Sequence, residues 1–222
     1  MKTSAECIKE HDIMTRKEEI VWNRFSSIYD RFMKKDEAVY QNIIKWVAQA
    51  LNPEDHVLEI ATGTGIIALG LAYHIKCIEA IDFSPDMIAV ARKKAQQSSI
   101  VGINFSVEDA YDLPYPPNSF DAVIIANTLH IMPKPEKALA EIRGILKPGG
   151  LLFAPIFIHA GSKKAALLSY IMSLTGFRAY HKWTLQSFQT FLEENEFSIV
   201  DSSLLKASFP LAYIVAKESE TK

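Results

Sequence analysis

The sequence predicts an α/β fold built on a doubly wound, mostly parallel sheet of seven strands, and three observations predict it. From His56 onward, short apolar runs alternate with segments of helix length, which is typical of βαβ units. Before residue 52, apolar residues recur at three- and four-residue intervals, as on the buried faces of helices. Near the C-terminus two apolar runs are separated by only about ten residues, fewer than a parallel crossover needs, so we expect the last strand to be antiparallel.

Each element follows from its own pattern. The N-terminal section predicts two helices, with apolar positions from Ile20 to Phe32 and from Val39 to Leu51. The apolar runs predict strands at Val57–Ile60, Cys77–Ile81, Ile103–Val107, Ala122–Ala126, Leu151–Ile158, Phe197–Val200 and Leu211–Val215. The helices between them are expected at Ile66–Ala72, at Met87–Ala95 after Ser84-Pro85, and at Ala138–Leu146 after Pro135-Glu136. Lys147-Pro148-Gly149-Gly150 is expected to stop that helix and turn into the next strand.

This pattern predicts one domain over residues 1–222. We expect an N-terminal helical lid at 1–52, a cofactor-binding core at 53–158, a cap insertion at 159–183, and a C-terminal helix and β-hairpin at 184–217. The segments outside the core are too short for a second hydrophobic core of their own.

Composition excludes several classes of protein. The 222 residues are 49% hydrophobic, and 24 Lys and Arg against 26 Asp and Glu leave a net charge of −2, which disfavours a nucleic-acid partner. Cys7 and Cys77 form no CxxC pair and the six histidines are scattered, so we expect no metal site and no disulfide scaffold. No apolar run approaches the roughly 18 residues of a spanning helix, and a cytoplasmic setting without an integral membrane segment is expected.

Candidate binding residues follow the ends of three strands. In a parallel sheet, ligands bind beyond the carboxyl ends of the strands. The glycine loop Ala61-Thr62-Gly63-Thr64-Gly65 allows close backbone approach, and the helix that follows favours an anionic group. Asp82 could accept both hydroxyls of a ribose, and Asp109 could accept from an adenine amino group. Gly63-x-Gly65-x-x-Ala68 also satisfies the dinucleotide fingerprint, so these residues alone fit both NAD and S-adenosylmethionine.

The wider set of motifs resembles the class I S-adenosylmethionine-dependent methyltransferases, which have a Rossmann-like fold. The motifs that carry the resemblance are Val57–Gly65, Ile81–Met87, Ser119–Val123 and Leu146–Gly150. Their order and spacing are kept, and the resemblance runs from about Val21 to Lys217. Phe25–Asp30 is similar to the lead-in of the branch that includes the ubiquinone and menaquinone biosynthesis methyltransferases. Ala61 stands where many members have the first glycine.

The resemblance implies a role for each matching residue. Glu59 would orient the glycine loop around Ala61, Gly63 and Gly65, together with the methionine end of the cofactor. The other implied cofactor-binding residues are Asp82 at the ribose, Phe83 and Met87 against the adenine, Asp109 and Ala110 at the adenine edge, Asn127 beside the reacting centre and Tyr29 closing over the cofactor. A sulfonium is already an activated methyl donor, so no metal is required. Our hypothesis for a substrate-contacting base is His130, three residues past Asn127.

The cap insertion contains a segment that is apolar nearly all round, from Gly161 to Phe177. Its candidate roles are a cap on an apolar substrate pocket, a membrane-surface contact, a self-association surface in a homodimer, and plain core. We favour the cap, with Tyr180, His181 and Trp183 near the pocket. The expected partner is a small, lipophilic acceptor molecule. Two other functions stay open at this point: an NAD(P)-dependent oxidoreductase, and a protein that binds S-adenosylmethionine without turnover.

Overall fold

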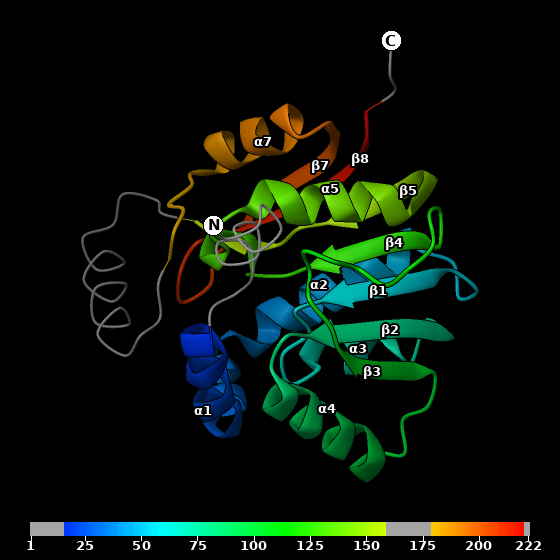
Figure 1. Cartoon of the computed structure of the whole chain (residues 1–222), viewed down its shortest axis with the longest axis vertical. Coiled ribbons are helices and arrows are strands. Elements are labelled where there is room, and N and C mark those ends of the chain that lie inside the picture. The colour runs from blue at the N-terminus through cyan, green and yellow to red at the C-terminus, as the bar shows by residue number, and fades with distance from the viewer. Residues whose placement is uncertain (1–15, 159–178, 220–222) are drawn as a thin grey trace, which may run out of the picture.

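The computed structural model describes residues 16–158 and 179–219, whose centre is one eight-stranded sheet flanked by helices (Figure 1). The described elements in chain order are α1 (Arg16–Met33), the 3-10 helix η1 (Lys34–Asp36), α2 (Glu37–Ala50), β1 (His56–Ile60), α3 (Ile66–Leu71), β2 (Cys77–Asp82), α4 (Pro85–Gln97), β3 (Ile103–Val107), β4 (Phe120–Ile125), the 3-10 helix η2 (Leu129–Ile131), α5 (Pro135–Ile145), β5 (Leu146–Phe153), β6 (Ile156–Phe157), α7 (Leu185–Glu194), β7 (Phe197–Leu205) and β8 (Leu211–Glu218).

The sheet has the predicted mixture of strand directions. Its order is β3-β2-β1-β4-β5-β8, and β6 and β7 both pair with β8. Strands β1 to β5 are parallel to one another, and β8 runs antiparallel to β5, β6 and β7. The predicted α/β fold with an antiparallel last strand is therefore confirmed.

The described strands number eight rather than seven because the strand expected at Leu151–Ile158 is interrupted. The backbone N–H of Ala154 still donates to the carbonyl of Ile214 at 2.9 Å. Pro155 has no N–H to continue the ladder, and pairing with β8 resumes only at Ile156. The helix α5 ends at Ile145, and β5 begins at Leu146, earlier than expected. Lys147–Gly150 form an irregular stretch of β5, because Phe120 pairs with Leu146 and Ala122 with Leu151, and Gly149 has a φ of 81°.

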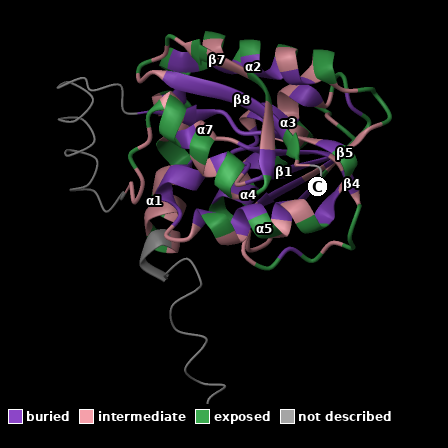
Figure 2. Cartoon of the chain, turned by 90° about the horizontal axis from the view of Figure 1, so that it is seen from above, coloured by how far each residue is buried: buried purple, intermediate pink, exposed green. Residues whose placement is uncertain are grey.

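Helices cover both faces of the sheet, as a doubly wound fold requires. On one face α5 and α7 pack buried side chains such as Leu139 and Phe188 against the strands. On the other face α2, α3 and α4 contribute Ile43, Leu71 and Ile88. Figure 2 shows buried residues along the strands and exposed residues on the outer sides of the helices. Apolar burial on both faces therefore fixes the sheet between two layers of helices.

The N-terminal segment runs without a loop from α1 through η1 into α2. Met33 and Asp36 are buried at the junction, and the Asp36 carboxylate accepts a hydrogen bond of 2.7 Å from the backbone N–H of Ser208. This contact ties the junction to the loop before β8. Figure 1 shows α1 beside α4. Within residues 16–158 and 179–219, no helix combines the length and apolar character needed to cross a membrane.

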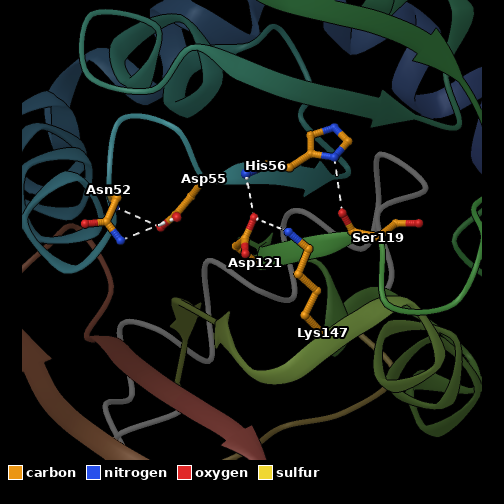
Figure 3. Close-up of polar contacts among 6 residues, drawn as sticks. All are labelled: Asn52, Asp55, His56, Ser119, Asp121 and Lys147. Carbon is orange, nitrogen blue, oxygen red and sulfur yellow. Dashed lines mark hydrogen bonds and ion pairs between the residues drawn. The ribbon is translucent and has the colours of Figure 1, made fainter.

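A polar cluster joins the starting ends of β1, β4 and β5 (Figure 3). The Asp121 carboxylate accepts from the backbone N–H of His56 at 2.9 Å and forms an ion pair with Lys147 at 2.7 Å. The His56 ring nitrogen Nδ1 lies 3.2 Å from the carbonyl oxygen of Ser119. These residues lie at the opposite end of the strands from the glycine loop, so their role is to fix strand register.

Candidate functional site

The glycine loop turns sharply where β1 ends. Ala61, Gly63 and Gly65 have φ angles of 55°, 57° and 78°, in the left-handed region that favours glycine. The backbone N–H of Thr62 donates to the Ile81 carbonyl at 2.9 Å, and that of Gly65 donates to the Thr62 carbonyl at 2.9 Å. The loop is thereby folded back onto the end of β2, and Ala61 occupies a strained conformation for a residue with a β-carbon.

The buried side chain of Glu59 hydrogen-bonds both to the glycine loop and to the first turn of α3. Its Oε2 accepts from the Thr62 hydroxyl at 2.6 Å and from the backbone N–H of Ala68 at 2.9 Å. Burial raises the pKa of Glu59 to about 7. We expected the start of α3 to attract an anion of the ligand. The structure instead gives the N–H of Ala68 to a carboxylate of the chain itself.

Asp82 connects the glycine loop to the loop that precedes α4. Its Oδ2 accepts from the backbone N–H of Gly63 and its Oδ1 from the backbone N–H of Ser84, both at 2.8 Å. Burial raises the pKa of Asp82 to about 6. A carboxylate oxygen can accept a second hydrogen bond. Asp82 can therefore hold both loops and still accept from two adjacent hydroxyls of a ligand.

These loops border a first cavity of about 710 Å³. It is lined by Trp22, Tyr29, Ile60, Ala61, Gly63, Ile81, Asp82, Phe83, Met87, Glu108, Asp109, Ala110, Ala126, Asn127, Thr128, Ile131 and Met132. All of the predicted cofactor-binding residues are among them except Glu59 and Gly65. A β-carbon on Gly65 would lie 3.2 Å from the Ala91 β-carbon of α4 and 3.3 Å from the Phe105 ring of β3, so this glycine allows the loop to pack closely against both elements.

The charges around the first cavity have one sign. The charged residues that line it are Asp82, Glu108 and Asp109, and none of its described lining residues is Lys, Arg or His. Phosphate groups would meet carboxylates there with no cation to neutralise them. The first cavity therefore favours a ligand that is neutral or positively charged over one that carries a pyrophosphate.

A second cavity of about 820 Å³ adjoins the first. It is lined by Trp22, Phe25, Tyr29, Phe32, Met33, Lys35, Asp36, Asn127, His130, Phe157, Ile158, Ala179 and Phe209. Trp22, Tyr29 and Asn127 line both cavities, so they form the boundary between them. The aromatic and aliphatic lining suits a flat, apolar molecule. His130 lies here and does not line the first cavity.

Asn127 is fixed at this boundary by three hydrogen bonds. Its backbone N–H donates to the Pro155 carbonyl at 2.7 Å, and its side-chain Nδ2 donates to the Tyr40 hydroxyl at 2.7 Å. Its Oδ1 accepts from the backbone N–H of Phe157 at 2.9 Å. Its φ of 52° is one that Asn tolerates better than most residues. Pro155, in the break between β5 and β6, and Phe157, in β6, thus supply two of the partners that position Asn127.

Tyr29, a residue of α1, lies at the same boundary between the two cavities as Asn127. Its ring carbon Cε1 lies 3.7 Å from the point where a β-carbon on Gly63 would stand. Burial, together with the nearby Asp82 and Glu59 carboxylates, raises the pKa of Tyr29 well above its usual value. The side chain therefore stays a neutral phenol that can donate a hydrogen bond into either cavity.

Several lining residues carry no signal in the sequence. Trp22 and Phe32 have the spacing of ordinary apolar positions of an amphipathic helix, and they become site residues only because α1 docks over the strand ends. Met132, Phe157 and Phe209 are likewise recognisable only from the fold.

Of the cap insertion, residues 159–178 lie outside the described residues, so the roles considered for Gly161–Phe177 stay predictions. The chain returns against η2, where the backbone N–H groups of Tyr180 and His181 donate to the His130 carbonyl at 2.9 and 3.1 Å. The His181 ring stacks on Trp183, which packs in turn against Phe191 of α7. Tyr180, His181 and Trp183 are close to η2, but none of them lines the second cavity.

Comparison with known proteins finds sequence similarity to methyltransferases. A model described as a methyltransferase domain matches residues 58–154. A demethylmenaquinone methyltransferase of Thermus thermophilus is 42% identical over 98 residues, which are 43% of this chain and 44% of that protein. The ubiquinone/menaquinone biosynthesis C-methyltransferase UbiE of Rickettsia massiliae is 26% identical over 208 residues, which are 84% of each chain.

Solved structures share the fold. A SAM-dependent methyltransferase of Thermotoga maritima superposes with a TM-score of 0.70 at 22% identity, covering 90% of this chain and 99% of that one. The [4+2]-cyclase SpnF superposes with a TM-score of 0.67 at 22% identity, covering 81% of this chain and 80% of that one. At these identities the likeness establishes the Rossmann-like arrangement and does not by itself assign a reaction.

Proposed function

Because the chain belongs to the class I S-adenosylmethionine-dependent methyltransferases, we propose that it transfers the methyl group of S-adenosylmethionine to a small, lipophilic acceptor bound in the second cavity. The observation that carries this proposal is the pair of adjoining cavities. One is lined by carboxylates and the other by aromatic rings, and they meet at Trp22, Tyr29 and Asn127.

The first cavity fits the cofactor of this family. Asp82 presents two carboxylate oxygens to the ribose hydroxyls, and Asp109 and Ala110 line the part of the cavity that would receive the adenine. A side chain at Gly63 would project toward the Tyr29 ring and narrow the space between the glycine loop and α1. The carboxylates around the cavity also suit a sulfonium cation.

The same charges argue against the oxidoreductase alternative. A nicotinamide dinucleotide carries a pyrophosphate, which such enzymes hold at a glycine loop and the start of a helix. Here the N–H of Ala68 is already bound to Glu59, and the charged residues lining the cavity are Asp82, Glu108 and Asp109. We therefore expect NADH to bind much more weakly than S-adenosylhomocysteine.

The second cavity supports an aromatic acceptor. Phe25, Phe32, Phe157 and Phe209 supply ring faces and edges against which a flat molecule can stack. Relatives named for demethylmenaquinone and for ubiquinone and menaquinone biosynthesis indicate the chemical class. We propose a quinone-like ring in its reduced, hydroxylated form as the acceptor, because the reduced ring is electron-rich and can attack a methyl carbon.

In the proposed mechanism the chain aligns the acceptor with the methyl group, keeps water out of the second cavity and accepts the proton that the acceptor releases. The cofactor, when bound, supplies an activated methyl group on a positively charged sulfur. Tyr29 and Asn127 hold the boundary through which the acceptor atom approaches in line with that group. The aromatic lining excludes water from the second cavity. His130, which lines the same cavity, takes the proton that an acceptor hydroxyl releases; the hydrogen of the methylated ring carbon then moves to that oxygen and restores the aromatic ring, so one proton is released per methyl group.

Equilibrium titration tests the cofactor assignment. We expect S-adenosylhomocysteine to bind the full chain with micromolar affinity, and NADH to bind at least about a hundredfold more weakly. Tight binding of NADH without binding of S-adenosylhomocysteine would overturn the proposal. A second titration with 1,4-naphthoquinone tests the acceptor cavity. Phe157→Ser should weaken that binding while leaving the affinity for S-adenosylhomocysteine unchanged, because Phe157 lines only the second cavity.

A further inference from the structure

Helix α1 forms a wall of both cavities and is held over the strand ends by polar contacts. Trp22 and Tyr29 line both cavities, and Phe25, Phe32 and Met33 line the second one. The width of the second cavity therefore depends on how closely α1 lies against the loops at the carboxyl ends of the strands.

The first polar contact is made by Asp30. Its Oδ1 accepts from the hydroxyl of Thr64 in the glycine loop at 2.5 Å, and its Oδ2 pairs with Lys94 of α4 at 2.8 Å. Lys94 also lies 3.5 Å from the Thr64 hydroxyl oxygen. Thr64 is fully buried, so the Asp30 carboxylate reaches the interior of the loop that the cofactor would touch.

The second polar contact is made by Asn23, about two turns earlier on α1. Its Oδ1 accepts from the hydroxyl of Ser84 at 2.5 Å. Ser84 is the N-cap of α4, and its Oγ accepts from the backbone N–H of Met87 at 3.2 Å. Asn23 and Asp30 thus attach α1 to the loops after β2 and β1, which Asp82 already joins to each other.

We propose that Asp30 is a positioning residue that couples the two cavities: by bridging Thr64 and Lys94, it makes a ligand that orders the glycine loop also fix the α1 wall of the acceptor cavity. This inference rests on the proposed function for the identity of the two ligands. Coupling of this kind is reciprocal, so occupation of the second cavity should in turn strengthen binding in the first.

The contribution of this bridge to overall stability is expected to be small. The Asp30 side chain is 48% exposed and that of Lys94 is 29% exposed, and exposed ion pairs contribute little to folding. The α1 helix is also held by the buried Met33 and by Asp36 at its end. Variants at Asp30 and Lys94 should therefore fold, and their effect should be confined to the placement of α1.

The test measures hydrogen exchange of the α1 amides and the binding of two probes. In the wild type, S-adenosylhomocysteine should slow exchange across residues 20–33 by about tenfold and tighten 1,4-naphthoquinone binding by at least about threefold. In Asp30→Ala, S-adenosylhomocysteine should neither slow the exchange of the α1 amides nor tighten 1,4-naphthoquinone binding. The affinity of this variant for S-adenosylhomocysteine should be no more than about threefold lower than that of the wild type. Lys94→Met should reduce both effects, whereas Lys93→Met, on the exposed face of α4, should leave them unchanged.

Two outcomes would overturn the inference, and they can be told apart. If the wild type shows coupling and Asp30→Ala retains it, Asp30 is not the positioning residue, while the proposed function stands. If the wild type binds neither probe, the proposed function fails and this inference fails with it. Circular dichroism of each variant shows whether a loss of coupling comes from unfolding. Lys94→Met tests the coupling in a second variant, one that removes the ion pair but keeps the hydrogen bond between Asp30 and Thr64.

Discussion

The Asp82 carboxylate accepts a hydrogen bond of 2.8 Å from the backbone N–H of Gly63, nineteen residues earlier in the chain. Through this bond the end of β2 fixes the loop after β1, and the other oxygen of Asp82 holds the N–H of Ser84 in the same way. The ionised carboxylate therefore shapes the first cavity before a ligand binds there.

Cofactor affinity should depend on pH through Asp82. Its pKa is raised to about 6, so the carboxylate is ionised at pH 7.5 and largely protonated at pH 5. The protonated acid accepts fewer hydrogen bonds from ligand hydroxyls. We expect the affinity for S-adenosylhomocysteine, measured by calorimetry, to be nearly constant above pH 7 and to fall about tenfold between pH 7 and pH 5.

Asp82→Asn is the matched variant for this prediction. It should bind S-adenosylhomocysteine about 10 to 100 times more weakly at pH 7.5 and should lose the pH dependence, because its amide cannot ionise. Asp86→Asn, an exposed acid at the start of α4, should behave as the wild type. An Asp82→Asn variant with the wild-type pH profile would show that another group controls binding.

Glu59 should make the folded state less stable as the pH rises. Burial raises the pKa of Glu59 from its ordinary value of 4.5 to about 7, so the folded state holds the proton more tightly than the unfolded chain does. The resulting stability is fully present below pH 4.5 and is lost as the pH rises through 7, by about 3 kcal/mol. Glu59→Gln keeps an acceptor oxygen for Thr62 and Ala68 but removes this titration.

Urea unfolding at pH 5 and pH 8 checks the Glu59 prediction. The free energy of unfolding of Glu59→Gln, relative to the wild type, should be higher at pH 8 than at pH 5. Wild-type and variant curves that stay parallel across this range would show that Glu59 is ionised at an ordinary pKa, through solvent or a cation that reaches it.

Ala61→Gly should stabilise the protein. Ala61 has a φ of 55°, where a β-carbon costs about 1 kcal/mol or more, and glycine adopts that angle without strain. We expect the free energy of unfolding to rise by about 1 kcal/mol. As a control, Ala89→Gly on the exposed face of α4 should lower it by a similar amount, because glycine is unfavourable inside a helix. A loss of stability in Ala61→Gly would contradict this reading of the turn.

His130 should affect turnover and leave cofactor binding unchanged. It lines the second cavity and not the first, so the affinity for S-adenosylhomocysteine should be unaltered in His130→Ala. If it accepts the acceptor's proton, kcat should fall by about a hundredfold or more, with the loss of one limb of the pH–rate profile. Unchanged turnover across pH would remove His130 from the mechanism.

The parts of the site that follow strands could be predicted from the sequence. Gly63, Asp82 and Asp109 each come directly after an apolar run, and parallel strands end at one edge of the sheet, so these residues had to meet. The family resemblance implied a role for Tyr29 of α1, but the roles of Trp22 and Phe32 could not be predicted, since these residues differ from core residues only in where the helix docks. The strand break at Pro155 has a cause that the sequence contains, since proline has no N–H for a strand ladder, but the partner strand β8 on which pairing resumes lies far along the chain.

The most direct test of the whole account is the transfer of a radiolabelled methyl group from S-adenosylmethionine to 1,4-naphthalenediol by the full chain. We predict that label enters the organic phase with one S-adenosylhomocysteine formed per methyl group transferred, and that the folded Asp82→Asn variant transfers far less. Tight binding of S-adenosylhomocysteine with no label transferred to this diol or to any component of a cellular lipid extract would contradict the account, and would identify a cofactor-binding protein without methyltransferase activity.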